Sequence, residues 1–409
     1  MKKKYKKQKK YLKYLSKRKK LSYIYKPYIF KIIRCLILLI FIIYIAYLHI
    51  HFIKYKKPQE ENIIETNIYK SFEEIRNKAT NSFEENILEK ISIFKHMFAE
   101  KIKKYKKRKN IIHITFSLSN GKNYKYILLV SMFSLLSNCN KDNIFIIIHI
   151  LCTPDFNESS FNLFKWLLIK YSHNVEMIFY NMGNNFMNHK NIRISQAAYY
   201  RLLCPLFIDS DRIIHLDGDT MTFSDLSEMY NLDFKDNYVL GFYDIDSKGI
   251  DYLGIKSNIY INSGVILLNL KKIREDSKTI QFVEMSNRKI IFKNFDQAVL
   301  NYILFPKIGR LPCKYGIWNF EDKSDIEFYL SNLRTKIPIN ELEEAFNNPA
   351  VIHFILCFRK PWFPDPVYFK IFTYCEQRHN CSCKKYYDLW HSIANKTDFY
   401  ENIKRFTKK

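Results

Sequence analysis

Residues Arg212-Ile-Ile-His-Leu-Asp-Gly-Asp219 form a short apolar run that leads directly into two carboxylates. Asp217 and Asp219 are two positions apart, so their side chains point to the same side of an extended chain. Two carboxylates that face one cavity repel each other unless a cation lies between them, and their hard oxygen atoms suit Mg²⁺ or Mn²⁺. The motif therefore predicts a divalent-cation site, in which the ion would neutralise a bound diphosphate.

Strands and helices alternate in the sequence around this motif. The hydrophobic patterns predict strands at 111–118, 143–151, 175–180 and 212–216, helices between them at 124–136, 161–171 and 195–206, and a surface helix at 225–230. Repeated β-α units predict a mainly parallel sheet that helices cover on both faces. Ligands of such folds bind at the carboxyl ends of the strands, which is where the two carboxylates lie. The expected fold class is therefore α/β, in one domain at 110–375.

The net charge of +26 is concentrated at the N-terminus. Residues 1–34 contain 15 Lys or Arg and no acidic residue, whereas the chain from 110 onward contains 36 basic and 31 acidic residues. A nucleic-acid-binding domain carries its basic surface on the folded part. The charge distribution therefore argues against nucleic acid as a partner. A membrane-bound adaptor, whose residues 1–34 bind anionic lipid or another partner, is a rival interpretation.

Residues 35–53 are predicted to span a membrane. This stretch contains no Lys, Arg, Asp or Glu, and about 20 apolar residues are needed to cross a bilayer. A buried core helix is the less favoured alternative. The excess of basic residues before the stretch predicts a cytosolic tail at 1–34 and a single-pass type II signal anchor at 35–53. The rest of the chain would then lie in the lumen of the secretory pathway, in the ER or the Golgi.

Sequons and cysteines fit a luminal compartment. The N-glycosylation sequons are Asn157-Glu-Ser159, Asn380-Cys-Ser382 and Asn395-Lys-Thr397. Eight of the nine cysteines lie outside the predicted span, an even number in an oxidising compartment. Cys375, Cys381 and Cys383 flank His379, but their spacing matches no usual zinc pattern, so a disulfide is the preferred interpretation.

Residues 54–109 are interpreted as a helical stem. Apolar side chains recur every three or four positions from Phe72 to Ile102, as one face of a helix requires. This face would either pair with a second copy of the chain, giving a homodimer, or lie on the main domain. Residues 376–409 are interpreted as a basic C-terminal tail.

Several ordered blocks resemble glycosyltransferase family 8, the group of glycogenin and the bacterial lipopolysaccharide glucosyl- and galactosyltransferases. The blocks are Ala197-Ala-Tyr-Tyr-Arg-Leu-Leu-Cys-Pro205, His215-Leu-Asp-Gly-Asp-Thr220, Asp225-Leu-Ser-Glu228, Ile261-Asn-Ser-Gly-Val-Ile-Leu-Leu-Asn-Leu270, Phe295-Asp-Gln-Ala-Val-Leu-Asn301, and His353 with Lys360-Pro-Trp362. The resemblance covers about residues 110 to 365, and ordered blocks are far more specific than one motif. It implies a single GT-A domain, with a Rossmann-like mixed sheet, that binds a UDP-sugar and Mn²⁺ and transfers the sugar with retention of configuration.

The resemblance also implies roles for individual residues. The implied metal ligands are Asp217, Asp219 and His353, and a neutral imidazole completes a mixed shell that suits Mn²⁺. The implied donor-binding residues are Asn123, Tyr124, Arg201, Asp217, Asp244, Asn262 and Lys360. Among these, Lys360 resembles a diphosphate contact, whose charge would stabilise the leaving UDP. Arg201 is equally well interpreted as a structural ion pair, and His215 is interpreted as a packed strand residue rather than a fourth ligand.

The implied catalytic residues are Asp296 and Gln297, in the place beneath the anomeric carbon. A carboxylate acts as nucleophile or stabilises an oxocarbenium ion, whereas an amide is a poor nucleophile. Double displacement and front-side attack both remain open at this point.

The sequence thus predicts a membrane-anchored, metal-dependent, retaining hexosyl- or pentosyltransferase. The donor would be UDP-glucose, UDP-galactose or a similar UDP-sugar, and the acceptor a glycan, glycoprotein or glycolipid. Three departures from the family pattern motivate an alternative, a catalytically inactive relative that only binds a sugar nucleotide or a partner. These are Gly121-Lys122 before Asn123, Ala298 after the Asp-Gln pair, and the glycine-free loop Phe354–Arg359 after His353.

Overall fold

The computed structural model describes residues 81–98, 110–119, 124–139, 144–156, 161–171, 175–186, 195–245, 258–288, 295–320, 322–355, 360–362 and 384–407. All of them belong to the unit Tyr69–Lys409. The basic residues 1–34, the predicted span 35–53, Asn123 and the sequons at Asn157 and Asn380 lie outside the described residues.

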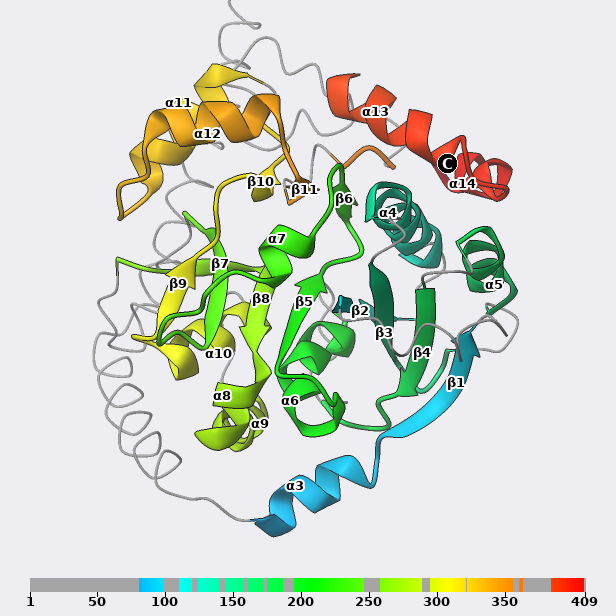
Figure 1. Cartoon of the computed structure of the whole chain (residues 1–409), viewed down its shortest axis with the longest axis vertical. Coiled ribbons are helices and arrows are strands. Elements are labelled where there is room, and N and C mark those ends of the chain that lie inside the picture. The colour runs from blue at the N-terminus through cyan, green and yellow to red at the C-terminus, as the bar shows by residue number, and fades with distance from the viewer. Residues whose placement is uncertain are drawn as a thin grey trace, which may run out of the picture. The chain divides into compact units, whose positions relative to one another are not determined.

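Within these residues, eight strands form the main sheet in the order β1-β4-β3-β2-β5-β8-β7-β9 (Figure 1). The strands are β1 Ser92–Phe98, β2 Ile111–Leu118, β3 Phe145–Cys152, β4 Val175–Asn181, β5 Arg212–Leu216, β7 Val239–Tyr243, β8 Ile261–Asn269 and β9 Ile308–Arg310. The run β4-β3-β2-β5 is parallel, β8 is antiparallel to both β5 and β7, and β1 is antiparallel to β4. The predicted parallel α/β core is confirmed for four strands, and the complete sheet is mixed.

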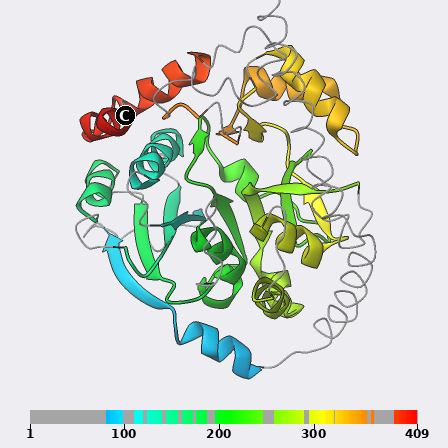
Figure 2. The same cartoon turned by 180° about the vertical axis from the view of Figure 1, so that it is seen from behind.

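Helices cover both faces of this sheet. On one face, α4 Tyr124–Cys139 packs against β2 and α5 Phe161–Lys170 packs against β4. Ile114 and Phe116 of β2 belong to this core and are fully buried, as alternation along a strand requires. On the other face lie the 3-10 helix η4 Gln196–Leu203, α6 Cys204–Phe207, α8 Leu270–Glu275, α9 Lys278–Ser286 and α10 Phe295–Leu304. Figure 2 shows the same layers from behind.

A small second sheet joins distant parts of the chain. Its strands are β10 Tyr315–Trp318, β11 Val351–His353 and β6 Thr220–Thr222, with β11 in the middle. In the antiparallel β11–β6 pair, His353 lies opposite Thr220. Phe354 N also donates to Asp219 O at 3.0 Å. This sheet therefore places His353 next to the carboxylates that follow β5.

The remaining described helices lie mostly around the second sheet and the C-terminus. They are α3 Asn81–Leu88, α7 Ser227–Tyr230, α11 Lys323–Asn332, α12 Ile339–Asn347, α13 Lys384–Ala394 and α14 Tyr400–Thr407. The helix predicted at 195–206 is a 3-10 helix up to Leu203 and continues as the short α6, which has Pro205 in its first turn. Proline fits the first turn of a helix because an N–H there has no partner within the helix.

The prediction of a helical stem at 54–109 is wrong for residues 92–98, which form a strand. Residues 81–88 are helical, but Ser92–Phe98 is β1, which pairs with β4 along an antiparallel register from Ser92 opposite Asn181 to Phe98 opposite Glu176. The apolar spacing suggested a helix, and pairing with the edge of the main sheet overrides such local preferences. The segment therefore adds an edge strand to the main sheet.

The C-terminal tail predicted at 376–409 also differs from the structure. Residues 384–407 form α13 and α14, and Figure 2 shows both helices (red) beside α4 (teal), which α13 contacts. Trp390 and Ile403 are buried in the main hydrophobic core. Burial of one large apolar side chain stabilises a fold by about 1.5–3 kcal/mol. These helices are therefore part of the folded domain.

Among the residues that the structure describes, no helix has both the length and the apolar character needed to cross a membrane. Cys152, Cys204 and Cys313 are buried as thiols rather than disulfides. The cysteines around His379, for which a disulfide is the preferred interpretation, lie outside the described residues.

Candidate active site

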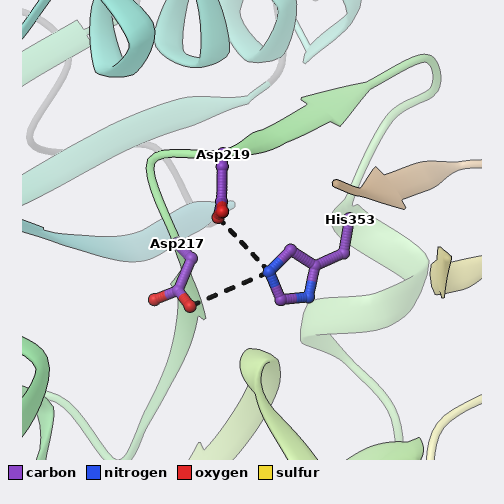
Figure 3. A group of neighbouring side chains, drawn as sticks. All are labelled: Asp217, Asp219 and His353. Atoms are coloured by element: carbon purple, nitrogen blue, oxygen red, sulfur yellow. Dashed lines mark ion pairs between the residues drawn. The ribbon is translucent and has the colours of Figure 1, made fainter. Parts of the chain in front are cut away.

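One loop and one short strand bring three candidate metal ligands together. Asp217 and Asp219 lie between β5 and β6, and His353 ends β11. His353 Nε2 lies 3.3 Å from Asp219 Oδ1 and 3.9 Å from Asp217 Oδ2 (Figure 3). One ligand atom from each residue lies within 4.8 Å of the others. The structure thus brings together the three residues that the sequence singled out, with two oxygen donors and one nitrogen donor.

Gly264 of β8 leaves the space that this cluster needs. A Cβ atom at Gly264 would overlap His353 Cε1 and would lie 2.7 Å from Asp217 Oδ2. Real Cβ atoms do not approach other atoms so closely. Gly264 was not among the predicted site residues, although it belongs to the quoted Asn-Ser-Gly block. Its role becomes visible only when β8 is placed beside β11.

Asp217 is held through Oδ1, the oxygen that does not face His353. Arg201 Nη2 lies 2.8 Å and His215 Nε2 3.1 Å from Asp217 Oδ1, which leaves Oδ2 toward His353. Burial alone would raise the pKa of Asp217, but Arg201 and then His215 hold this pKa well below its ordinary value. Burial, followed by the charge of Arg201, lowers the pKa of His215 to about 4. A neutral His215 therefore donates its Nε2–H to Asp217, and it is a buried strand residue as predicted.

Asp219 forms an ion pair with Lys360. Lys360 Nζ lies 2.6 Å from Asp219 Oδ2, while Oδ1 faces His353. Burial opposes ionisation, yet Lys360 and His353 lower the pKa of Asp219 to about 2. The predicted diphosphate contact thus lies directly beside the three-residue cluster.

The predicted sugar-side residues form a connected hydrogen-bond network. Asn262 Nδ2 donates to Asp244 Oδ2 at 3.0 Å and to Gln297 Oε1 at 3.1 Å, and Gln297 Nε2 donates to Asp244 Oδ2 at 3.1 Å. All three side chains are buried. The structure therefore brings together Asp244, which directly follows β7, with Asn262 of β8 and Gln297 of α10.

Asp296 is linked to this network through Ser263, whose N–H donates to Gln297 Oε1 at 3.1 Å, and Asp296 also pairs with Arg201. Arg201 Nε lies 3.3 Å from Asp296 Oδ2, and Ser263 Oγ donates to the same oxygen at 3.4 Å. Burial raises the pKa of Asp296 to about 6, although Arg201 opposes the shift. Because Arg201 pairs with both Asp217 and Asp296, the structure favours its interpretation as a structural ion pair.

Tyr124 lies at the start of α4, close to the metal-ligand loop. A Cβ atom on Gly218 would lie 2.8 Å from the Tyr124 hydroxyl, so the tyrosine packs against the turn between the two carboxylates. Burial raises the pKa of Tyr124 well above its ordinary value, and Asp219 and Asp217 raise it further. Tyr124 is therefore a neutral phenol beside the carboxylates.

Comparisons with known proteins agree with this architecture. The sequence model described as glycosyl transferase family 8 matches residues 113–365. A Haemophilus influenzae relative is 31% identical over 197 residues, which are 45% of this chain and 57% of that protein. The lipopolysaccharide 1,2-glucosyltransferase of Escherichia coli is 29% identical over 234 residues, which are 53% of this chain and 67% of that enzyme.

Solved structures show the same fold. The bifunctional glycosyltransferase WbbM matches with a TM-score of 0.58 at 18% identity, over 74% of this chain and 52% of WbbM. The galactosyltransferase LgtC, solved with donor and acceptor sugar analogues, matches with a TM-score of 0.51 at 20% identity, over 70% of this chain and 96% of LgtC. The mixed α/β fold expected from the sequence is therefore the fold of these glycosyltransferases. Since the family match runs from β2 past Lys360 and covers more than half of the chain, this protein belongs to glycosyltransferase family 8.

Proposed function

We propose that this protein is a divalent-metal-dependent, retaining glycosyltransferase that takes its sugar from a UDP-sugar. The observation that carries this proposal is the convergence of Asp217, Asp219 and His353 in a cluster kept open by Gly264. The donor would be UDP-glucose, UDP-galactose or a similar hexose or pentose donor, and the acceptor a glycan, glycoprotein or glycolipid.

The residues of the cluster fit Mn²⁺ or Mg²⁺. Two carboxylates and one imidazole make a hard, mixed oxygen–nitrogen donor set. Asp217 Oδ1 is already occupied by Arg201 and His215, so Asp217 would bind the ion through Oδ2. When bound, the ion would neutralise the diphosphate and stabilise the charge that grows on the leaving UDP.

Lys360 supplies the second positive charge for the diphosphate. Its ammonium group lies 2.6 Å from Asp219 Oδ2, directly beside the place proposed for the ion. A fixed cation at the place where negative charge develops is the largest single contribution in many enzymes. Lys360 is therefore proposed to contact the diphosphate, as the sequence predicted.

The network of Asp244, Asn262 and Gln297 is proposed to bind the hydroxyl groups of the sugar. Both ends of the Gln297 amide are already hydrogen-bonded, and Asp296 is paired with Arg201. An amide held in this way orients a sugar but does not attack it. The arrangement supports front-side attack, with Gln297 and Asp296 bracing the cation-like sugar.

The inactive relative is the weaker alternative. A protein that no longer needs a metal has no reason to keep two carboxylates and one histidine in register, with a glycine beside them. We therefore favour the active enzyme. The membrane anchor at 35–53 and the secretory-pathway location are proposed on the sequence pattern alone.

Donor hydrolysis by the full-length protein tests the proposal. The purified chain is screened with UDP-sugars, with Mn²⁺ or Mg²⁺ added and with the metal removed by a chelator. We expect metal-dependent hydrolysis of at least one donor, a loss in Asp219→Ala, and no loss in Asp236→Ala, which removes a carboxylate that is 72% exposed. No turnover with any donor, together with equal behaviour of the two variants, would contradict the proposed function.

A further inference from the structure

The strand β8 leaves its regular pairing with β7 at the active site. Ile261 lies opposite Tyr243 and Ile266 lies opposite Gly241, with a register shift between the two pairs. Residues 262–265 therefore lie outside the regular ladder on that side. This irregular segment contains Asn262, Ser263 and Gly264, which face the sugar network and the metal cluster.

Side chains replace the missing ladder bonds of this segment. Ser263 N donates to Gln297 Oε1 at 3.1 Å, and Gly264 N donates to Asn262 Oδ1 at 2.9 Å. Arg201 Nη1 donates to the carbonyl oxygen of Ser263. A buried backbone group without a partner costs free energy, so these side chains determine the course of the backbone.

Asn301 makes the bonds at the entrance of the segment. Its Oδ1 accepts from Ile261 N at 2.8 Å, and its Nδ2 donates to Ile261 O at 2.8 Å. The same Nδ2 donates to Gln297 O at 2.9 Å, one helical turn earlier in α10. Asn301 is completely buried. Its side-chain amide thus makes the two hydrogen bonds to Ile261 that a neighbouring strand would make, and it joins β8 to α10.

We propose that Asn301 is a positioning residue of the active site, which sets the backbone of residues 261–264 and thereby the places of Asn262 and Gly264. This inference rests on the proposed transferase function. Asn301 makes no hydrogen bond to a side chain of the cluster or of the sugar network, and it meets the network only at the backbone carbonyl of Gln297. It acts through Ile261, and a shift there would move Asn262 relative to Gln297 and Gly264 relative to His353.

The amide chemistry is specific to asparagine at this position. Leucine has a similar size but can neither accept from Ile261 N nor donate to Ile261 O. An ionised aspartate accepts from Ile261 N but repels Ile261 O, whereas a protonated aspartic acid both accepts and donates. Asn301→Asp should therefore regain function as the pH falls, relative to the wild-type protein at the same pH.

The test compares Asn301→Leu and Asn301→Asp with Asn269→Ala in the full-length protein. Asn269 caps α8 at the opposite end of β8, where its Oδ1 accepts from Lys272 N at 3.0 Å, so its loss destabilises the same strand far from the site. Residues that orient a site from behind typically change affinity or activity about 10- to 100-fold. We expect such a loss of kcat in Asn301→Leu, wild-type kcat and KM in Asn269→Ala, and partial recovery of Asn301→Asp at lower pH.

Two measurements without turnover separate this inference from the proposed function. Amide hydrogen exchange at Ile261 and Ser263 should be faster in Asn301→Leu, and Mn²⁺ should bind more weakly to this variant in a direct titration. If the wild-type protein hydrolyses no donor, the proposed function fails and these two readouts still decide the role of Asn301. Unchanged exchange and unchanged Mn²⁺ affinity, or kinetics equal to those of Asn269→Ala, would overturn the inference.

Discussion

Arg201 Nη2 lies 2.8 Å from Asp217 Oδ1, so a buried guanidinium holds from behind the carboxylate that is proposed to bind the cation. The same guanidinium reaches Asp296 through Nε at 3.3 Å. Arg201 therefore links the metal side of the site to the sugar side. Lysine has no planar group that could bond in two directions at once.

Removal of Arg201 should strongly destabilise the protein. Arg201→Ala leaves the buried Asp296 and the partly buried Asp217 without the cation that is itself only 3% exposed, and breaking such a buried pair typically costs about 3–5 kcal/mol. Arg310 is a matched control, because it pairs with Glu341 but both side chains are 28% exposed. Solvent weakens that pair, so Arg310→Ala should cost only about 1 kcal/mol. The free energy of unfolding in urea distinguishes the two variants, and equal losses would contradict the buried-pair argument.

A single methyl group at Gly264 should abolish metal binding. The Cβ of Gly264→Ala would overlap His353 and Asp217, so the three ligand atoms could no longer converge. Gly309→Ala is the control, because its Cβ would crowd Leu240 at the edge strand β9, away from the cluster. Both variants should lose stability, but only Gly264→Ala should lose Mn²⁺ affinity in a calorimetric titration. Normal Mn²⁺ binding by Gly264→Ala would exclude the proposed ligand set.

A substitution of Lys360 should weaken donor binding without weakening metal binding. Lys360→Met keeps an unbranched side chain that is one atom shorter but removes the charge that lies 2.6 Å from Asp219 Oδ2. We expect UDP to bind more weakly and kcat to fall about 100-fold or more, as for other groups that stabilise charge in the transition state. Mn²⁺ affinity measured without UDP should stay equal or rise, because a competing cation is gone. Weaker Mn²⁺ binding together with unchanged UDP binding would argue that Lys360 only supports the cluster.

The sequence predicted those parts of the fold that local pattern encodes. The strand at 111–118 and the strand at 212–216 coincide with β2 and β5, because buried β-branched runs followed by polar turns leave little ambiguity. The edge strand β1 was predicted as helix, since its pairing partner β4 is distant in sequence. The two C-terminal helices were missed because their buried Trp390 and Ile403 lie among charged residues.

At the site, too, residues in local motifs could be predicted, whereas residues whose role depends on a distant neighbour could not. The ligands Asp217, Asp219 and His353 could be chosen from ordered motifs, and the structure brings them together. Gly264 and Asn301 could not be assigned, because one supplies empty space and the other backbone bonds across two elements. Such roles depend on which residue lies opposite, and a single sequence does not contain that information.

Acid should weaken the sheet through His149. This side chain is buried in β3, with Nε2 3.0 Å from His113 Nδ1 and Nδ1 3.1 Å from the Tyr180 hydroxyl. Burial, with a smaller contribution from His113, lowers the pKa of His149 to about 3. The unfolded chain then binds a proton that the folded protein does not bind, between the unfolded pKa of about 6.5 and the folded value. Stability due to this difference is complete above the unfolded pKa and is lost as the pH falls toward the folded pKa.

At pH 5 this loss should be about 2 kcal/mol, since each unit of pKa difference corresponds to about 1.4 kcal/mol. His149→Gln removes the titrating group and should therefore lose about 2 kcal/mol less stability than the wild-type protein between pH 7.5 and pH 5. The raised pKa of Asp296 has the opposite effect on stability, because it stabilises the folded protein as the pH falls. This effect is the same in the wild-type protein and in His149→Gln, so it cancels in the comparison. Urea unfolding at the two pH values measures the difference. An equal loss in both proteins would mean that His149 is protonated in the folded sheet, and that the bonds to His113 and Tyr180 do not hold it neutral.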